Sequence, residues 1–128
     1  MEIGAKYRVE ITVSENETAK AFGSGTLLVL ATPKMIALME EASYKCIDKY
    51  LEEGQSSVGT YLDVKHVAAT PVGMKAYAEA EIIEIDGRRV VFSVNAYDEK
   101  GLIGEGKHER FIINSEKFVA KTYQKLEK

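Results

Sequence analysis

The sequence predicts an α+β fold in which a curved antiparallel sheet wraps around one long helix, with a short helix at the C-terminus. Three observations predict it. One segment, residues 33–53, has the apolar spacing of an amphipathic helix. Five other segments have the alternation or the turn signals of β-strands, and most of them follow one another closely. Wrapping an antiparallel sheet around the helix is the economical way to bury its apolar side.

The composition is that of a globular protein. The chain has 128 residues, 45% hydrophobic and 29% charged, so we expect one domain over residues 1–128. A net charge of −3 with scattered basic residues disfavours nucleic acid as a partner. The single cysteine, Cys46, cannot form an internal disulfide, and no signal-peptide or membrane-span pattern is found. We therefore expect a soluble, cytoplasmic protein that does not associate with membranes.

The N-terminal part leads the chain to the start of the long helix. Residues 7–13 alternate apolar and polar side chains and predict a half-buried strand. The polar segment 14–21 (SENETAKA) predicts a loop. Residues 22–31 (FGSGTLLVLA) pass from a flexible Gly-Ser-Gly segment into a short apolar run that ends at Thr32.

Thr32 and Pro33 form a helix start signal. A threonine at the N-cap can accept a hydrogen bond from an unpaired amide, and a proline at the first helical position loses no needed donor. We expect the helix to run from about Pro33 to about Glu53, with Gly54 ending it.

The helix has one broad apolar side, and Glu40 lies on it. At about 100° per residue, Glu41 joins the solvated side, where Lys45 is four residues on, whereas Glu40 falls between Ile47 and Leu51. A carboxylate against apolar surface is a candidate for catalysis. Alternatively, its stem packs and its head reaches water. The apolar side comprises Met35, Ile36, Met39, Ala42, Cys46, Ile47, Tyr50 and Leu51.

The next strand carries a histidine on its apolar face. Residues 58–69 alternate again, and the even positions Val58, Leu62, Val64 and Ala68 share a face with His66. Asp63 points to the opposite face, toward solvent. A histidine in this setting is either a catalytic acid or base or a satisfied core residue.

The rest of the chain predicts three further strands and a helix. Residues 75–86 and 88–97 flank the hairpin signal Asp86-Gly87, and residues 102–113 follow a turn at 98–101. Ser115 has the chemistry of an N-cap for a C-terminal helix. With 58–69, these strands predict a meander of four. Because such a sheet leaves open edges, we expect a homodimer or a dimer of dimers.

Three segments together resemble a known family: LATPKMIALMEEA, SVGTYLDVKHVAATPVGM and GEGKHERFIINSEKFVAK. In order and spacing they resemble the hot-dog thioesterases of the fluoroacetyl-CoA thioesterase family, over roughly residues 28–125. The resemblance implies a hot-dog fold and hydrolysis of an acyl-CoA thioester. It also implies that Thr32, Glu40 and His66 form the catalytic set and that Gly59 lies against the acyl group. Arg110 falls in a motif shared with the family and either supports the site or binds phosphate; the alternative is a surface or interface ion pair.

Thioester hydrolysis can use these residue types. Glu40 is the expected nucleophile or general base, and both routes require it as the ionised carboxylate. His66 can position water, polarise the carbonyl or move a proton. Thr32 can donate its hydroxyl to Glu40 or to the substrate, beside the partly positive helix start. Direct attack and water activation both remain open. No cofactor is expected, coenzyme A being part of the substrate.

Other residues have simpler interpretations. Thr32 can be an N-cap alone. Cys46, in the middle of the apolar side with no base nearby in sequence, is expected to be a buried structural thiol. His66 and His108 lack the partners and spacing of a metal signature, so we expect no metal. Arg88 and Arg89 mark either a solvated hairpin end or a phosphate contact.

The chain departs from the family pattern in the segment that leads up to Thr32. There the fluoroacetyl-specific member has a gate of bulky aromatic side chains, whereas this chain has GSGTLLVL, with Phe22 as the aromatic residue of the lead-in. Fluoroacetate resistance is therefore not implied. The alternative function is a non-catalytic hot-dog module that binds acyl-CoA. A dehydratase is disfavoured because Asp63 and His66 lie on opposite strand faces.

Overall fold

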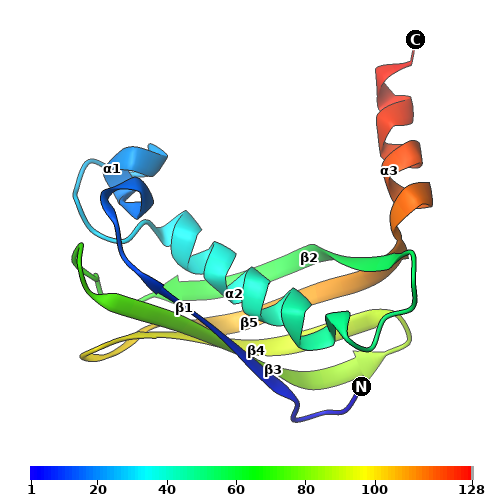
Figure 1. Ribbon diagram of the computed structural model, residues 1–128, viewed down its shortest axis with the longest axis horizontal. Helices are drawn as coiled ribbons and strands as arrows, with labels where there is room; N and C mark the ends of the chain where they lie inside the picture. The colour runs from blue at the N-terminus through cyan, green and yellow to red at the C-terminus, as the bar shows by residue number, and fades with distance from the viewer. Residues whose placement is uncertain (128) are drawn as a thin grey trace.

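The computed structural model describes residues 1–127 (Figure 1). Within this range no helix is both long and apolar enough to cross a membrane. The elements in chain order are β1 (Lys6–Thr12), η1 (Glu15–Glu17), α1 (Ala19–Phe22), α2 (Thr32–Asp48), β2 (Gln55–His66), β3 (Lys75–Asp86), β4 (Arg89–Asp98), β5 (Gly101–Asn114), α3 (Ser115–Tyr123) and η2 (Gln124–Leu126).

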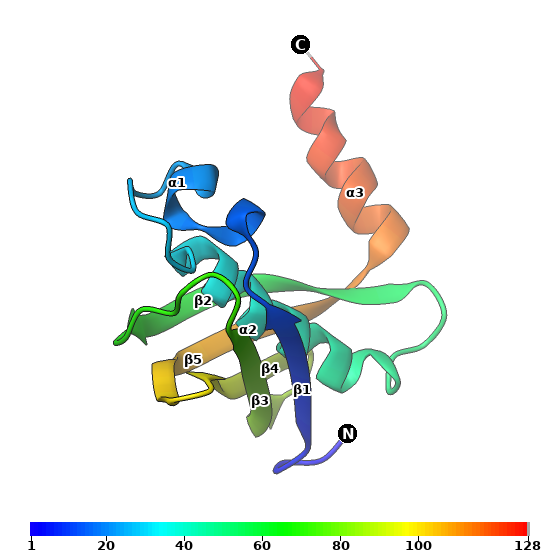
Figure 2. The same cartoon turned by 60° about the vertical axis from the view of Figure 1, so that its left-hand side comes forward.

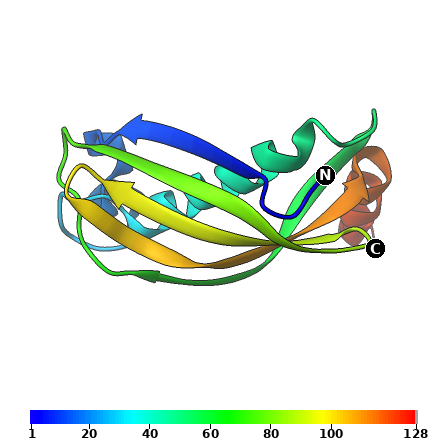
Figure 3. The same cartoon turned by 90° about the horizontal axis from the view of Figure 1, so that it is seen from below.

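The five strands form one antiparallel sheet in the order β1-β3-β4-β5-β2. The sheet curves, and α2 runs along its inner face, as seen from the side in Figure 1 and from below in Figure 3. The expected fold class is confirmed: a curved antiparallel sheet around one long helix, followed by a short helix.

The strand order corrects one part of the prediction. β2 pairs with β5, not with β3, so only β3, β4 and β5 form a meander. The reason is that residues 67–74 form a crossing connection and not a hairpin turn. Thr70 anchors it, because its carbonyl accepts from Leu30 N at 2.9 Å and its hydroxyl donates to Asp98 Oδ2 at 2.8 Å. Val29 also forms an isolated bridge with Pro71.

The core lies between α2 and the inner face of the sheet. The side chains of β3 that face the helix are small, which lets the helix approach closely. Gly104 of β5 also lets the helix approach closely, because a Cβ there would lie only 2.5 Å from Met35 Sδ. The buried inner-face residues of β3 and β4 include Ala76, Ala78, Ala80, Ile82, Phe92, Val94 and Ala96, against Met35, Leu38, Met39, Ala42, Cys46 and Ile47 of α2.

The bounds of α2 differ from the prediction at both ends. The N-cap is Ala31, without a side-chain cap, and Thr32 is the first helical residue. The helix ends at Asp48 instead of Glu53. Beyond it, hydrogen bonds between residues three apart, from Tyr50 N to Ile47 O and from Leu51 N to Asp48 O, replace the helical pattern. Gly54, with φ of 85°, then turns the chain into β2.

Smaller differences occur elsewhere. The segment 14–21, predicted as a loop, contains η1 and most of α1, which starts behind an N-cap at Thr18. β2 begins at Gln55 and ends at His66, three positions earlier than predicted at each end. A register shift between Gly59 and Tyr61 turns Val58 away from the face of His66. The N-cap of α3 is Asn114, not Ser115, since its side chain accepts from Lys117 N at 3.0 Å.

Candidate active site

Thr32 and His66 come together at one end of the molecule, where α2 begins and β2 ends. Thr32 Oγ1 lies 2.7 Å from His66 Nδ1. The prediction that Thr32 is the N-cap was wrong, because Ala31 takes that position and the threonine hydroxyl bonds to the histidine. Both segments are held by backbone bonds, from Ala31 N to Glu17 O at 2.9 Å and from Val67 N to Ile103 O at 2.7 Å.

The environment of His66 favours the neutral imidazole. Burial lowers its pKa, and the backbone of Ala68 acts in the opposite direction. Its Nε2 is buried and has no hydrogen-bond partner among residues 1–127. One ring nitrogen is therefore held by Thr32 while the other is unpaired, which suits a group that gives or takes a proton.

A surface hollow of about 320 Å³ adjoins this pair. It lies between the lead-in to α2 and the segment after β2. Its wall combines the small Ala19, Ser24, Ala68 and Ala69 with Val29, Leu30 and Val67, beside Thr32 and His66.

Glu40 lies in a second group, farther along α2. Its Oε2 is 3.2 Å from the point where a Cβ on Gly59 would stand. The same point is 3.0 Å from His108 Cε1 and 3.5 Å from Arg110 Nη1. Any side chain larger than hydrogen at this position would crowd all three groups. The glycine thus lets the half-buried Glu40 carboxylate approach the sheet beside a histidine and an arginine.

Arg110 is a buried cation with its guanidinium held on several sides. The residue is 7% exposed. Its Nε donates to Ser57 Oγ and its Nη2 donates to Ser57 O, both at 2.8 Å. The third nitrogen, Nη1, lies 3.1 Å from His108 Nε2. Burial lowers the pKa of Arg110, and the charges of Glu40 and Asp48 oppose that effect. In the described residues it forms no ion pair within 4 Å, contrary to the surface ion pair considered above.

The two groups are separate within one chain. Thr32 and Glu40 are eight residues apart on α2, which at 1.5 Å per residue is about 12 Å along the helix axis. A hydrogen bond from the Thr32 hydroxyl to Glu40, one of the two expected roles, is therefore not formed within one chain. Thr32 meets His66 at one end of α2, and Glu40 meets Gly59 and Arg110 near its middle.

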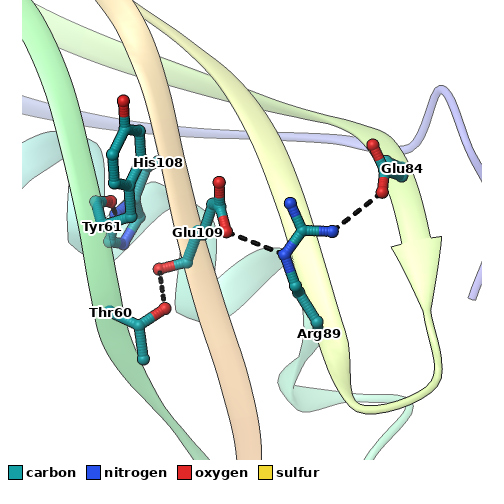
Figure 4. A network of polar contacts seen from close by, with 6 residues as sticks. All are labelled: Thr60, Tyr61, Glu84, Arg89, His108 and Glu109. Atoms are coloured by element: carbon teal, nitrogen blue, oxygen red, sulfur yellow. Dashed lines mark hydrogen bonds and ion pairs between the residues drawn. The ribbon is translucent and has the colours of Figure 1, made fainter.

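Sequence reasoning missed His108. It is fully buried, and its Nδ1 lies 2.9 Å from the carbonyl oxygen of Tyr61. The signal was its spacing of two residues from Arg110, which puts both on one face of β5. Figure 4 shows His108 beside Tyr61, with Glu109 on the other side of the strand.

The remaining candidates have structural surroundings. Cys46 is 3% exposed, its Sγ contacts Ala5 O at 3.6 Å, and burial raises its pKa, which confirms a buried thiol. Arg89 donates to Glu84 and to Glu109 at 2.8 Å and so links three strands on the outer face (Figure 4). The Arg88 guanidinium lies over the Phe111 ring at 5.4 Å.

Comparison with known proteins identifies the family of this chain. A family model described as fluoroacetyl-CoA-specific thioesterase, FlK, matches residues 13–116. A fluoroacetyl-CoA thioesterase from Streptantibioticus cattleyicolor is 45% identical over 97 residues, which are 76% of this chain and 70% of that protein.

Solved structures extend the likeness to the whole fold. One structure of the fluoroacetyl-CoA thioesterase FlK is 37% identical, with a TM-score of 0.94 over 98% of this chain and 97% of that chain. A mutant of FlK in complex with fluoroacetate and CoA is 35% identical, with a TM-score of 0.88 over 92% and 99% of the two chains. The fold and its relatives define a hot-dog thioester hydrolase. The chain belongs to the FlK family of fluoroacetyl-CoA-specific thioesterases.

Proposed function

We propose that the protein hydrolyses a small or medium acyl-CoA thioester to the free acid and coenzyme A, with Glu40, His66 and Thr32 as its catalytic residues. The observation that carries the proposal is the approach of the Glu40 carboxylate to the sheet, at 3.2 Å from the Cβ position of Gly59 and beside the buried Arg110, in a chain of this family.

Glu40 acts as nucleophile or as general base. Its oxygen, or a water that it deprotonates, attacks the thioester carbon, and the carbonyl electron pair moves to oxygen. Collapse of this intermediate restores the carbonyl and breaks the C–S bond, and the thiolate of coenzyme A leaves. In the direct route, water then hydrolyses the mixed anhydride that joins the acyl group to Glu40.

The Thr32–His66 pair supplies the proton chemistry. A neutral His66 whose Nε2 is unpaired can deliver a proton to the leaving thiolate or orient the attacking water. The hydroxyl of Thr32, 2.7 Å from Nδ1, fixes the ring. Unpaired amides in the first turn of α2 add a partly positive environment for the developing oxyanion.

A homodimer reconciles the two separated groups. β2 is an edge strand, and Tyr61 and Leu62 on it are 49% and 42% exposed. An antiparallel pair formed by β2 and its copy about a two-fold axis near residues 62 and 63 would set Gly59 opposite the partner's His66. Each active site would then combine Glu40, Gly59 and Arg110 of one subunit with Thr32 and His66 of the other.

The volume of the hollow beside His66 supports a small or medium acyl substrate. With about 320 Å³ it is at the lower end of the usual range for ligand sites. Phe22, the aromatic residue of the lead-in, does not line it and is 46% exposed. Fluoroacetyl selectivity is therefore not part of the proposal.

The test is thiol release from a panel of acyl-CoA thioesters by the wild-type protein and by the Glu40→Ala and His66→Ala variants. We expect a loss of about 10²-fold or more in kcat for each variant. The matched control is Glu41→Ala, since that glutamate pairs with Lys45 at 2.7 Å on the solvated side. If the wild-type protein binds the thioesters without releasing thiol, it is the non-catalytic acyl-CoA-binding module and the proposal fails.

A further inference from the structure

The hydrogen bonds of His108 define its tautomer. A carbonyl oxygen can only accept, so the contact of Nδ1 with Tyr61 O at 2.9 Å requires a proton on Nδ1. The other contact joins Nε2 to Nη1 of Arg110 at 3.1 Å, and a guanidinium can only donate. His108 is therefore neutral, donating from Nδ1 and accepting at Nε2.

The surroundings of His108 keep it neutral. It is fully buried, and burial is the main cause that lowers its pKa. The carbonyl of Tyr61 raises it, Arg110 lowers it, and Glu40 and Glu109 raise it by smaller amounts. Protonation would also set an N–H at Nε2 against an N–H of Arg110, so the hydrogen bond that Nε2 accepts from Nη1 would be lost.

The acceptor at Nε2 completes the set of partners around the guanidinium. Ser57 accepts hydrogen bonds from Nε and Nη2, which fixes one edge of the planar guanidinium. Nη1 is the nitrogen on the side of Gly59, at 3.5 Å from its Cβ position, where Glu40 also approaches. His108 is the partner that holds this nitrogen.

We propose that His108 is a positioning residue of the active site: its Nε2 accepts from Arg110 Nη1 and so fixes the guanidinium beside Glu40 and Gly59. The role in catalysis rests on the thioesterase function proposed above. His108 itself does not touch the reacting atoms, since its two ring nitrogens are already engaged.

Two substitutions separate this role from a purely structural one. In His108→Gln the amide oxygen can reach the position of Nε2 and still accept from Arg110. In His108→Asn the amide nitrogen can still donate to Tyr61 O, but nothing accepts from Nη1. If His108 only packs or holds Tyr61, His108→Asn should behave more like the wild-type protein than His108→Gln. If His108 holds Arg110, His108→Gln should behave more like the wild-type protein.

The experiment measures kcat and KM for the best thioester of the panel, together with the side-chain ¹⁵N–¹H spectrum of arginine-labelled protein. We expect His108→Gln to keep kcat within about threefold of wild type and His108→Asn to lower it about tenfold or more, in line with the loss of one preorganised contact. The Arg110 Nη protons should exchange slowly in the wild-type and glutamine proteins and fast in the asparagine variant.

Each outcome decides the inference. If the asparagine variant matches the wild-type protein in kcat and in the Arg110 spectrum, or if it exceeds the glutamine variant in both, the positioning role is wrong. If the wild-type protein hydrolyses no thioester, the proposed function fails. The Arg110 spectrum then decides by itself whether His108 holds the guanidinium. Thermal unfolding of all three proteins identifies a variant that has merely lost its fold.

Discussion

At the scale of single residues, two adjacent glutamates have different surroundings. Glu41 forms an ion pair with Lys45 at 2.7 Å on the solvated side of α2. Glu40 turns toward the sheet, where the absence of a side chain on Gly59 makes room for its carboxylate. The position of the Glu40 carboxylate therefore depends on this glycine.

Gly59→Ala should lower activity more than stability. The new methyl group would meet His108 Cε1 at 3.0 Å and Glu40 Oε2 at 3.2 Å, so the carboxylate must move. We expect kcat/KM to fall about tenfold or more, since small displacements of a catalytic group are costly. Thr60→Ala is the control on the same strand, because its hydroxyl contacts Glu109 O on the outer face. Equal kcat/KM for the two variants would contradict the assigned position of Glu40.

The buried His108 should make stability depend on pH. Its pKa is lowered in the folded protein, so the unfolded chain binds the proton first as the pH falls below about 6.5. Stability is thus fully present above that value and declines as the pH falls through the lower folded pKa. In urea unfolding at pH 7.5 and pH 5, His108→Gln should lose less stability than wild type. An identical loss in both proteins would show that His108 is not buried as a neutral group.

Periodicity predicted the directions of Glu40 and His66 but not their partners. Helix and strand alternation depend on local sequence alone, and they identified both side chains as facing the core. The contacts of Ser57 and Gly59 with Arg110 depend on β2 lying next to β5, residues about 50 positions apart in the chain. Because β2 was predicted next to β3, periodicity did not bring Gly59 and Arg110 together; they entered the predicted site only through the family resemblance, and His108 was assigned no role.

At the scale of elements, the pairing of β2 with β5 determines where the site lies. His66 and Gly59 are both on β2, opposite Gly104 and Arg110 of β5. The two strands approach closely at Gly106, where a Cβ would collide with the Asp63 carbonyl oxygen and stand 2.6 Å from Val64 Cα. Close packing thus explains both glycines of the GEGKHER segment, Gly104 against Met35 of α2 and Gly106 against β2.

Gly106→Ala should therefore destabilise the protein. Since the atoms in the way are mainly backbone, β2 must shift, and we expect a loss of about 1–3 kcal/mol in the free energy of unfolding. Urea denaturation measures it. Glu105→Ala, at an exposed position on the outer face of the same strand, is the control and should change stability by less than about 0.5 kcal/mol. A Gly106→Ala protein as stable as wild type would contradict the tight β2–β5 contact.

Elements were predicted more reliably than their ends and order. β3 was predicted with its observed bounds, because alternation and the Asp86-Gly87 turn agree. The end of α2 was placed too far along, since the apolar Tyr50 and Leu51 continue the helical spacing although tight turns close the helix before them. The order of β2 depends on how residues 67–74 cross, which no local signal reports.

At the scale of the whole molecule, two features extend beyond the core. β2 forms an open edge of the sheet, and α3 projects away from the body, as Figures 1 and 2 show. The exposed side chains of this end of the chain include Phe118, Val119, Tyr123 and Leu126. An open edge beside exposed apolar groups is the arrangement expected of a subunit that associates.

The proposed dimer makes a direct prediction for the edge. Light scattering after size exclusion should give the mass of two or four chains for the wild-type protein, and Leu62→Arg should shift it toward the monomer through a charge at the junction. Ile83→Arg, a partly exposed position on β3 away from that edge, is the control and should leave the mass unchanged. A wild-type monomer at assay concentration would contradict the shared site.

The most direct test of the shared site combines two inactive variants in one dimer. Co-expressed His66→Ala and Glu40→Ala chains, purified through a different tag on each, form a heterodimer in which one of the two sites keeps both residues. The account predicts about half of the wild-type thiol release for this heterodimer, whereas each homodimer stays inert. A purified heterodimer as inactive as the two homodimers would contradict it.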